Sequence, residues 1–311
     1  MIPLAPLPEQ RRIAAKLDAL LGRVEACRDR LDAVPRLLKR FRQAVLAAAT
    51  SGELTAEWRE KRGNESSWTE TSLSTCFNVF SGFAFKKNQY SASGSKLLQI
   101  ANVGYGYTIW EDVNYVPEGI ADTTYCNFKL KADDIVMALN RPITNGLLKV
   151  AQISYEDLPS TIYQRVACLR LKLPVNKQYI FYSLQTLAFL RQVEKNLQGS
   201  DQPYINTSSL AYLTLNLPSL KEQHEIVRRV EALFAVADKL EARYATARKQ
   251  VDQLTPALLA KAFRGELVPQ DPADEPAPAL LARIRAEREA GGQAALFEAG
   301  VKGRRKGGRI A

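Results

Sequence analysis

The sequence predicts an α+β protein in which one mixed α/β domain is inserted between two long helical arms that pair as an antiparallel coiled coil. Three observations predict this fold. Residues 9–54 align without a gap with residues 222–267 after a shift of 213 positions, and 13 of the 46 pairs are identical. Both repeats carry apolar residues at alternating steps of four and three, which indicates helices. The segment between the repeats instead consists of short apolar runs separated by turn residues, so a repeated module is predicted to frame a different domain.

The two arms occupy residues 1–54 and 218–267, and their apolar stripe follows the a and d positions of a heptad repeat. The predicted coiled-coil seam comprises Ile13, Leu17, Leu20, Val24, Leu31, Ile226, Val230, Leu233, Leu240, Tyr244, Val251 and Leu254. The core of an ordinary helical bundle is the alternative interpretation. Pro35 is expected to end or kink the first helix and Pro256 to start a short last one, because proline lacks an amide donor. Gly52 and Gly265 are expected to stop the helices.

The rest of the chain divides into segments that differ in composition and hydrophobic pattern. A polar linker is predicted at 55–67, a sheet-rich domain at 68–217, a short helix at 268–290, and a basic, disordered tail at 291–311. The apolar runs of the sheet-rich domain lie at 96–103, 107–113, 134–139, 147–153 and 165–173, and one helix-like stretch covers 179–197.

Composition excludes several classes of protein. No apolar run approaches the roughly 20 residues that span a bilayer, and the first residues lack the order of a signal peptide. With one histidine, His224, and four dispersed cysteines, no metal site is expected, and reduced cytoplasmic thiols are the simplest reading. The net charge of +10 is spread over the chain, with +4 in residues 1–65, +2 in 66–216 and +4 in 217–311. An acidic partner is therefore supported, but its site is not located.

The sequence offers no catalytic constellation and predicts no cofactor. Phosphate-loop, HExxH and GxGxxG motifs are absent, and the single histidine leaves no Ser-His or Cys-His pair. Two acidic pairs, Asp133-Asp134 and Glu156-Asp157, lie beside turn signals and are interpreted as solvated surface. The sheet-rich domain is therefore predicted to be a binding module.

Loops of this domain carry cations and amides beside small and aromatic residues. Arg and Lys recognise guanine, Asn and Gln recognise adenine, and the same side chains bind phosphates. Solvated loops are the alternative interpretation. The candidate DNA-binding residues are Lys86, Lys87, Asn140, Arg141, Asn145, Gln164 and Arg165.

The arms and the domain between them together resemble the specificity subunit of type I restriction–modification systems. The resemblance rests on PLPEQRRIAAKLDALL and LPSLKEQHEIVRRVEALF, on AAATSGELTAEWRE and AKAFRGELVPQDPADEPAPALLARIRAER, and on SGFAFKKNQY and GSDQPYINTSSLAYLTLNLPSL. It extends from residue 1 to about residue 290. Family members contain two target-recognition domains, each followed by a spacer helix, and the two spacers form an antiparallel coiled coil.

The resemblance implies a non-catalytic cytoplasmic subunit that reads one half of a bipartite DNA site and docks methylation subunits. It implies double-stranded DNA as a partner and leaves open a restriction subunit, a second specificity half-subunit or a homodimer. Because this sequence begins at a spacer, the first recognition domain is expected to be missing. Two alternatives come from other classes: a coiled-coil scaffold with a protein-binding insert, and a stand-alone DNA methyltransferase or nuclease.

Overall fold

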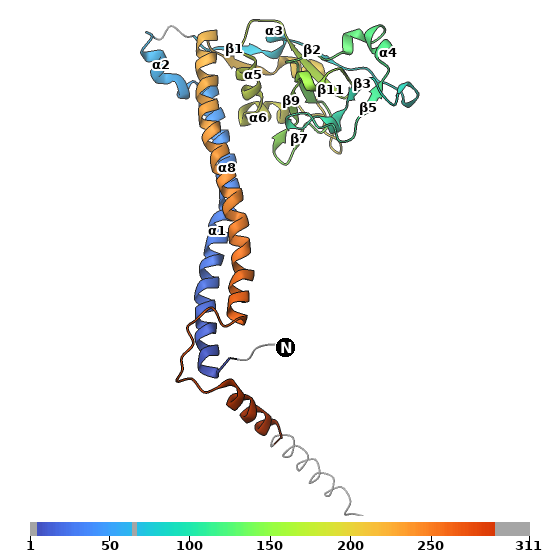
Figure 1. Ribbon diagram of the computed structural model, residues 1–311. Coiled ribbons are helices and arrows are strands. Elements are labelled where there is room, and N and C mark those ends of the chain that lie inside the picture. The colour runs from blue at the N-terminus through green and yellow to red at the C-terminus, as the bar shows by residue number, and fades with distance from the viewer. Residues whose placement is uncertain (1–4, 64–66, 290–311) are drawn as a thin grey trace, which may run out of the picture. The chain divides into compact units, whose positions relative to one another are not determined.

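The computed structural model describes residues 5–63 and 67–289 and confirms a mixed α+β fold that contains two long helices and a sheet domain (Figure 1). The chain forms two compact units. Unit 1 contains Met1–Arg36 and Leu240–Ala311, and unit 2 contains Leu37–Lys239.

The helices are α1 Leu7–Ser51, α2 Ala56–Glu60, α3 Leu73–Cys76, α4 Glu118–Asp122, α5 Lys177–Leu184, α6 Leu187–Lys195, α7 Thr207–Tyr212 and α8 Leu220–Phe263, and residues 277–289 are also helical. The strands are β1 Thr69–Ser72, β2 Phe77–Ser81, β3 Ser95–Leu98, β4 Tyr105–Gly106, β5 Asn114–Val116, β6 Ile135–Ala138, β7 Ile143–Thr144, β8 Leu147–Leu148, β9 Val150–Gln152, β10 Ser160–Ile162, β11 Val166–Leu171 and β12 Thr214–Leu217.

The long helices α1 and α8 pack antiparallel within each unit. In unit 1, Arg28 pairs with Asp252 and Asp32 with Arg248, so the partner number falls as the α1 number rises. In unit 2, Arg42 Nη2 lies 2.6 Å from Asp238 Oδ1. Helix α8 ends in a Schellman motif, because the amide of Glu266 donates to the carbonyl of Lys261 over 2.9 Å, the amide of Gly265 donates to the carbonyl of Ala262 over 3.1 Å, and Gly265 has φ +72°.

The expected helix end at Pro35 and the expected helix start at Pro256 are wrong. Helix α1 continues through Pro35 and α8 through Pro256. Both prolines are exposed, so water can satisfy the carbonyl that loses its amide partner. The stop at Gly52 agrees with the structure, since Gly52 follows the last residue of α1 with φ +86°.

The predicted seam residues differ in burial. Val24, Ile226 and Val230 are buried, and Ile13, Leu17, Leu20, Leu31, Leu233, Tyr244 and Val251 are half-buried. Leu240 and Leu254 remain 45% and 44% exposed. Two helices enclose only one side of each seam position, so a two-helix pair leaves part of its apolar stripe open to solvent.

The inserted domain of unit 2 is built on a five-stranded sheet in the order β2-β11-β6-β9-β4. Neighbours in this sheet are antiparallel except β4 and β9, which are parallel. A three-stranded sheet has the order β10-β3-β5, and two-stranded sheets join β1 to β12 and β7 to β8. The β1–β12 pair brings the two ends of the insert together, with Thr69 opposite Leu217.

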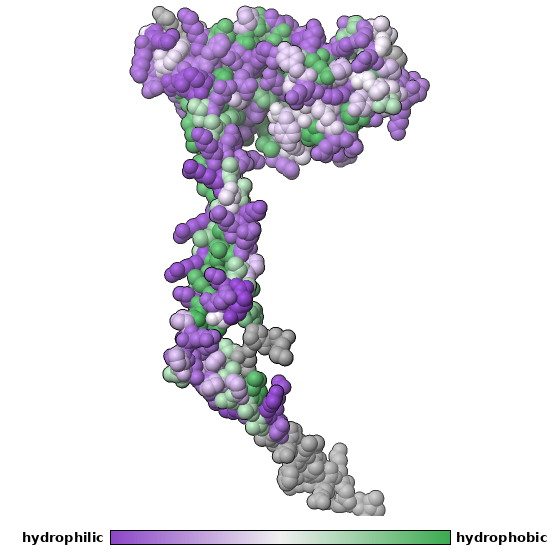
Figure 2. Space-filling view, viewed as in Figure 1, coloured by the Kyte–Doolittle hydropathy of each residue, from purple (hydrophilic) through white to green (hydrophobic). Residues whose placement is uncertain are grey.

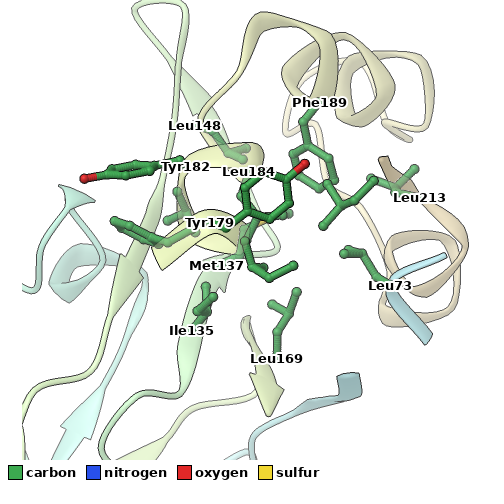
Figure 3. Close-up of a cluster of buried hydrophobic side chains, with 14 of the residues drawn as sticks. Leu73, Ile135, Met137, Leu148, Leu169, Tyr179, Tyr182, Leu184, Phe189 and Leu213 are labelled. Carbon is green, nitrogen blue, oxygen red and sulfur yellow. The ribbon is translucent and has the colours of Figure 1, made fainter. Parts of the chain in front are cut away.

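Both faces of the five-stranded sheet are buried, which explains why its central strands are apolar runs rather than alternating ones. Ile135 and Met137 of β6 join a core with residues of α5 and α6 (Figure 3). Residues of the two long helices belong to the same core. Val136, between them, points into a second core with Leu98 and Ile162 of the three-stranded sheet. The sheet is therefore held from both sides.

Two further predictions about the insert need correction. The stretch 179–197 is two helices, α5 and α6, because the Thr186 hydroxyl accepts from the amide of Phe189 and caps a new helix. The run 107–113 is not a strand. Its carbonyls at Ile109 and Asp112 accept instead from the side-chain amide of Asn102, over 2.9 Å each.

Both acidic pairs were expected to be solvated, but one acid of each pair is buried. Asp134 is 3% exposed and pairs with Arg170 at 2.6 Å. Asp157 is 6% exposed and accepts hydrogen bonds from Thr108 and Trp110 at 2.6 and 2.7 Å. Burial opposes ionisation of Asp157, but the hydrogen bonds from Thr108, Trp110 and Ser154 outweigh it and lower the pKa of this carboxyl. One acid of each pair is thus a structural anchor.

Candidate nucleic-acid interface

Most of the predicted DNA-binding residues lie in segments that leave or enter one end of the five-stranded sheet. Strand register places the end of β2 and the start of β11 together, with Ser81 opposite Ala167. The end of β6 lies there too, with Ala138 opposite Val166. Residues 82–87 follow β2, residues 139–146 follow β6, and residues 164–165 precede β11. The fold therefore brings three separate segments to the same end of these strands, which is called the edge of the sheet from here on.

Backbone hydrogen bonds hold these segments against one another. The amide of Leu139 donates to the carbonyl of Arg165 over 2.9 Å, and the amide of Gln164 donates to the carbonyl of Phe83 over 3.2 Å. Gly82 makes this approach possible, because a Cβ there would lie 1.9 Å from the carbonyl oxygen of Ile162. The Gln164-Arg165 turn is thus fixed by its neighbours on both sides.

The segment 139–146 ends in a tight hairpin formed by β7 and β8, at the lower edge of the insert in Figure 1. Asn145 and Gly146 have φ of +52° and +69°, as a two-residue type I′ turn requires. Arg141 also has a positive φ, +47°, which is uncommon for a residue with a long side chain. Such backbone strain is typical of sites that hold a side chain in place for a function.

The side chains at this edge are available to a ligand. Lys86, Lys87, Arg141, Asn145, Gln164 and Arg165 are exposed, and Asn140 is half-buried. Among residues 5–63 and 67–289, none of these side chains forms a hydrogen bond or ion pair within the chain. Arg170 of the same domain behaves differently, since it is held by Asp134. Ion pairing inside the fold therefore does not account for Arg141 or Arg165.

Lys86 and Lys87 belong to a smaller lobe beside the three-stranded sheet. Phe83 and Phe85, which precede them, pack against Tyr125 with ring centroids 4.5 and 4.8 Å apart. The backbone amide of Lys86 donates to the side-chain oxygen of Gln89 over 2.8 Å. These contacts fix the backbone from which the two exposed lysine side chains extend, one short segment beyond the end of β2.

Residues 198–204 lie at the same edge, although no residue of this loop was among the candidates. The amide of Arg141 donates to the carbonyl of Pro203 over 2.7 Å, and the amide of Ile205 donates to the carbonyl of Leu139 over 2.9 Å. The polar run QGSDQPY marks a loop, but its partner is about 60 positions away in the sequence. Local patterns carry no signal for such a pairing.

Unit 1 contains a separate cavity of about 620 Å³ between α1 and α8. Its lining includes Ile13, Leu17 and Ala262, together with Glu9, which is only 4% exposed. The repeat relates each of these residues to a position 213 residues away. Ile13 corresponds to Ile226, Leu17 to Val230, Glu9 to Glu222 and Ala262 to Ala49, and all four of these counterparts are fully buried in unit 2. Those three apolar residues belong to the core shared with the insert. The same repeated surface is thus covered in unit 2 and hollow in unit 1.

The described residues contain no group of three or more His, Cys, Asp or Glu side chains placed to hold a metal ion. Within the same residues, no helix is long and apolar enough to cross a membrane. Figure 2 shows the insert with a largely hydrophilic surface on the face in view.

Comparison with known proteins identifies the class. The family model "Type I restriction modification DNA specificity domain" matches residues 65–246, which is more than half of the chain. The chain therefore belongs to the family of type I restriction–modification specificity proteins.

Individual relatives agree with this assignment. The chain is 34% identical to the EcoBI specificity subunit of Escherichia coli over 94% of its own length and 65% of that subunit. It is also 34% identical to the EcoDI specificity subunit of Escherichia coli, over 91% of this chain and 68% of the relative. A chain from a solved type I restriction–modification system has the same fold, with a TM-score of 0.62 and 22% identity over 85% of this chain and 61% of that one. The chain thus spans about two thirds of the length of these relatives.

Proposed function

We propose that this chain is a DNA sequence-recognition subunit of a type I restriction–modification complex and reads one half of a bipartite site without catalysis of its own. One observation carries this proposal. The chain belongs to the specificity family, and at the edge of its five-stranded sheet it presents cationic and amide side chains that have no partner inside the described fold. Arginine and lysine neutralise phosphates, and arginine also binds guanine through two hydrogen bonds.

The seven candidates divide into two roles. Lys86 and Lys87 are assigned to phosphate contacts, because a flexible ammonium supplies charge without fixed geometry. Arg141 and Arg165 are assigned to base reading, because each stands on a backbone held by its neighbours. Asn140, Asn145 and Gln164 supply amide groups at the same edge.

The experiment is alanine substitution at each of the seven positions, measured in the complex with the cognate methylation subunit. Binding to a target duplex and its single-base variants is followed by fluorescence anisotropy at two salt concentrations. A base reader should lose about 1–3 kcal/mol and its preference at one position. A phosphate contact should weaken all duplexes alike and lower the salt slope by about one. If all seven variants bind as wild type does, the interface lies elsewhere.

We propose further that methylation subunits dock on the helices of unit 2. Leu37 and Val236 are 58% and 52% exposed there, and Phe41 is 38% exposed, so these helices offer apolar side chains that a partner can cover. Leu37→Glu together with Val236→Glu should abolish co-purification with the methylation subunit and leave the melting temperature unchanged. Arg40→Glu, at an exposed position of the same helix, is the control for added negative charge.

A second recognition domain, from another specificity half-subunit or a second copy, is proposed to cover the cavity of unit 1. The repeat relation supports this, since the equivalent residues of unit 2 are buried by a recognition domain. Sedimentation distinguishes the two sources. If the protein is a dimer and Leu17→Lys dissociates it, the second domain comes from a second copy of this chain. If the protein is a monomer and gains mass only when another half-subunit is added, the second domain comes from that half-subunit. A cytoplasmic location is proposed together with this role.

A further inference from the structure

The loop 199–203 is a rigid element at the edge of the sheet. Gln198 and Tyr204 exchange two backbone hydrogen bonds, of 2.8 and 2.9 Å, that close the loop at its base. Gly199 has φ +77°, and a Cβ there would lie 3.2 Å from the carbonyl oxygen of Gln202. Pro203 further restricts the backbone. A side chain on this loop is therefore held in one place before any ligand binds.

The loop lies directly beside the proposed base-reading residues. The carbonyl of Pro203 accepts from the amide of Arg141 over 2.7 Å, and the carbonyl of Leu139 accepts from the amide of Ile205 over 2.9 Å. Leu139 in turn donates to Arg165. Backbone bonds therefore connect the loop, the segment after β6 and the turn before β11 in one row.

Asp201 is the acidic residue of this loop, and it is exposed. Within the described parts of the chain, its carboxylate forms no hydrogen bond and no ion pair, although Arg141 and Arg165 belong to the neighbouring segments. A free carboxylate beside a surface that binds phosphates repels the DNA backbone. Such a group gains favourable contact with DNA only where the bases present hydrogen-bond donors.

We propose that Asp201 is a specificity-determining residue whose carboxylate accepts a hydrogen bond from the exocyclic N4 amine of a cytosine in the major groove. This inference rests on the DNA-reading function proposed above. Aspartate is an acceptor that suits the cytosine amine, and it opposes the acceptor atoms of guanine and thymine at the same position. Asp201 thus contributes discrimination by repelling other bases, at the expense of general affinity.

The sign of the effect separates Asp201 from the cations around it. Removing a phosphate-binding lysine weakens binding to every duplex. Removing Asp201 should instead leave non-target binding as strong as in wild type or stronger, because a repulsive charge is lost. At the same time, the preference for cytosine at one position of the half-site should fall by about 5- to 150-fold.

The test compares Asp201→Ala, Asp201→Asn and wild type in the complex with the cognate methylation subunit, against duplexes that vary one base pair at a time. Asp201→Asn should raise the relative affinity for adenine at the same position, because an amide can bind the N6 and N7 atoms of adenine. Glu156→Ala is the matched control. Glu156 is also exposed, but it follows β9 at the opposite end of the sheet, where Ile135 lies opposite Gln152.

The outcomes distinguish this inference from the function on which it rests. Loss of preference at one cytosine in both Asp201 variants, with Glu156→Ala unchanged, supports it. Unchanged preference at every position in a folded Asp201→Ala overturns it, and the same holds if Asp201→Ala weakens all duplexes alike. If the arginine variants lose affinity while Asp201→Ala has no effect, the DNA-reading function stands and Asp201 has no part in it. If wild type itself binds every duplex equally, both fail.

Discussion

Replacing Arg59 by methionine should destabilise unit 2 strongly, because it leaves a buried carboxylate without its cation. Arg59 Nη1 donates to Glu222 Oε1 over 2.5 Å, and Nη2 donates to the carbonyl of Gly52 over 2.7 Å. The side chain of Glu222 is fully buried, and its Oε2 atom has no hydrogen-bond partner. This contact joins the start of α8 to the turn that follows α1.

The magnitude follows from what remains after the substitution. The Thr55 hydroxyl still donates to Glu222 Oε1 over 2.6 Å, so the carboxylate keeps one neutral donor. A buried ion pair that loses one partner typically costs about 3–5 kcal/mol. The methionine retains much of the packing of the Arg59 stem, so the loss is mainly electrostatic. We therefore expect a decrease of about 3 kcal/mol or more in the free energy of unfolding.

Urea unfolding followed by tryptophan fluorescence measures this change, since all three tryptophans lie in unit 2. The double variant Arg59→Met with Glu222→Leu should recover part of the stability, because it removes the uncompensated charge. Arg228→Met is the matched control. The side chain of Arg228 is 67% exposed and pairs with Glu225 on the surface of α8, so its loss should cost under about 1 kcal/mol. Equal losses for Arg59→Met and Arg228→Met would refute the reasoning.

Three further outcomes are expected. Leu20→Asp combined with Leu233→Asp should lower the melting temperature, because each places an unpaired charge at a half-buried position of the apolar stripe, whereas Leu37→Asp, at an exposed position, should not. Equal melting curves for the double variant and wild type would contradict the helix pairing. Gly82→Ala should weaken DNA binding and stability together, because no space exists for a Cβ; a neutral result in both assays counts against the described turn. The folded-state pKa of Asp157 is lowered, so its stabilisation is present above its unfolded pKa of about 4 and lost as pH falls below that; Asp157→Asn should remove this part of the acid sensitivity in urea titrations.

Local patterns in the sequence were sufficient for the helical frame. The shift of 213 positions relates Leu7 to Leu220, and these are the first residues of α1 and α8. Heptad spacing is a property of a single helix, so its signal needs no knowledge of the partner. The glycine stop after α1 is equally local, because only the backbone conformation of Gly52 decides it.

Contacts between distant residues decided the rest. Pro35 did not break its helix, because packing of α1 against α8 outweighs the loss of one hydrogen bond at an exposed position. Asp134 was indistinguishable from a surface acid until the fold placed Arg170 beside it.

The same distinction holds for the candidate site. The types of its residues could be read from the loops, but their common edge depends on the register of β2, β11 and β6. The loop that carries Asp201 joins this edge through a hydrogen bond between Arg141 and Pro203, which lie 62 positions apart in the sequence. Periodicity and turn signals report the conformation of neighbouring residues. Which loops meet depends on how the sheets pack, and only the tertiary structure contains that information.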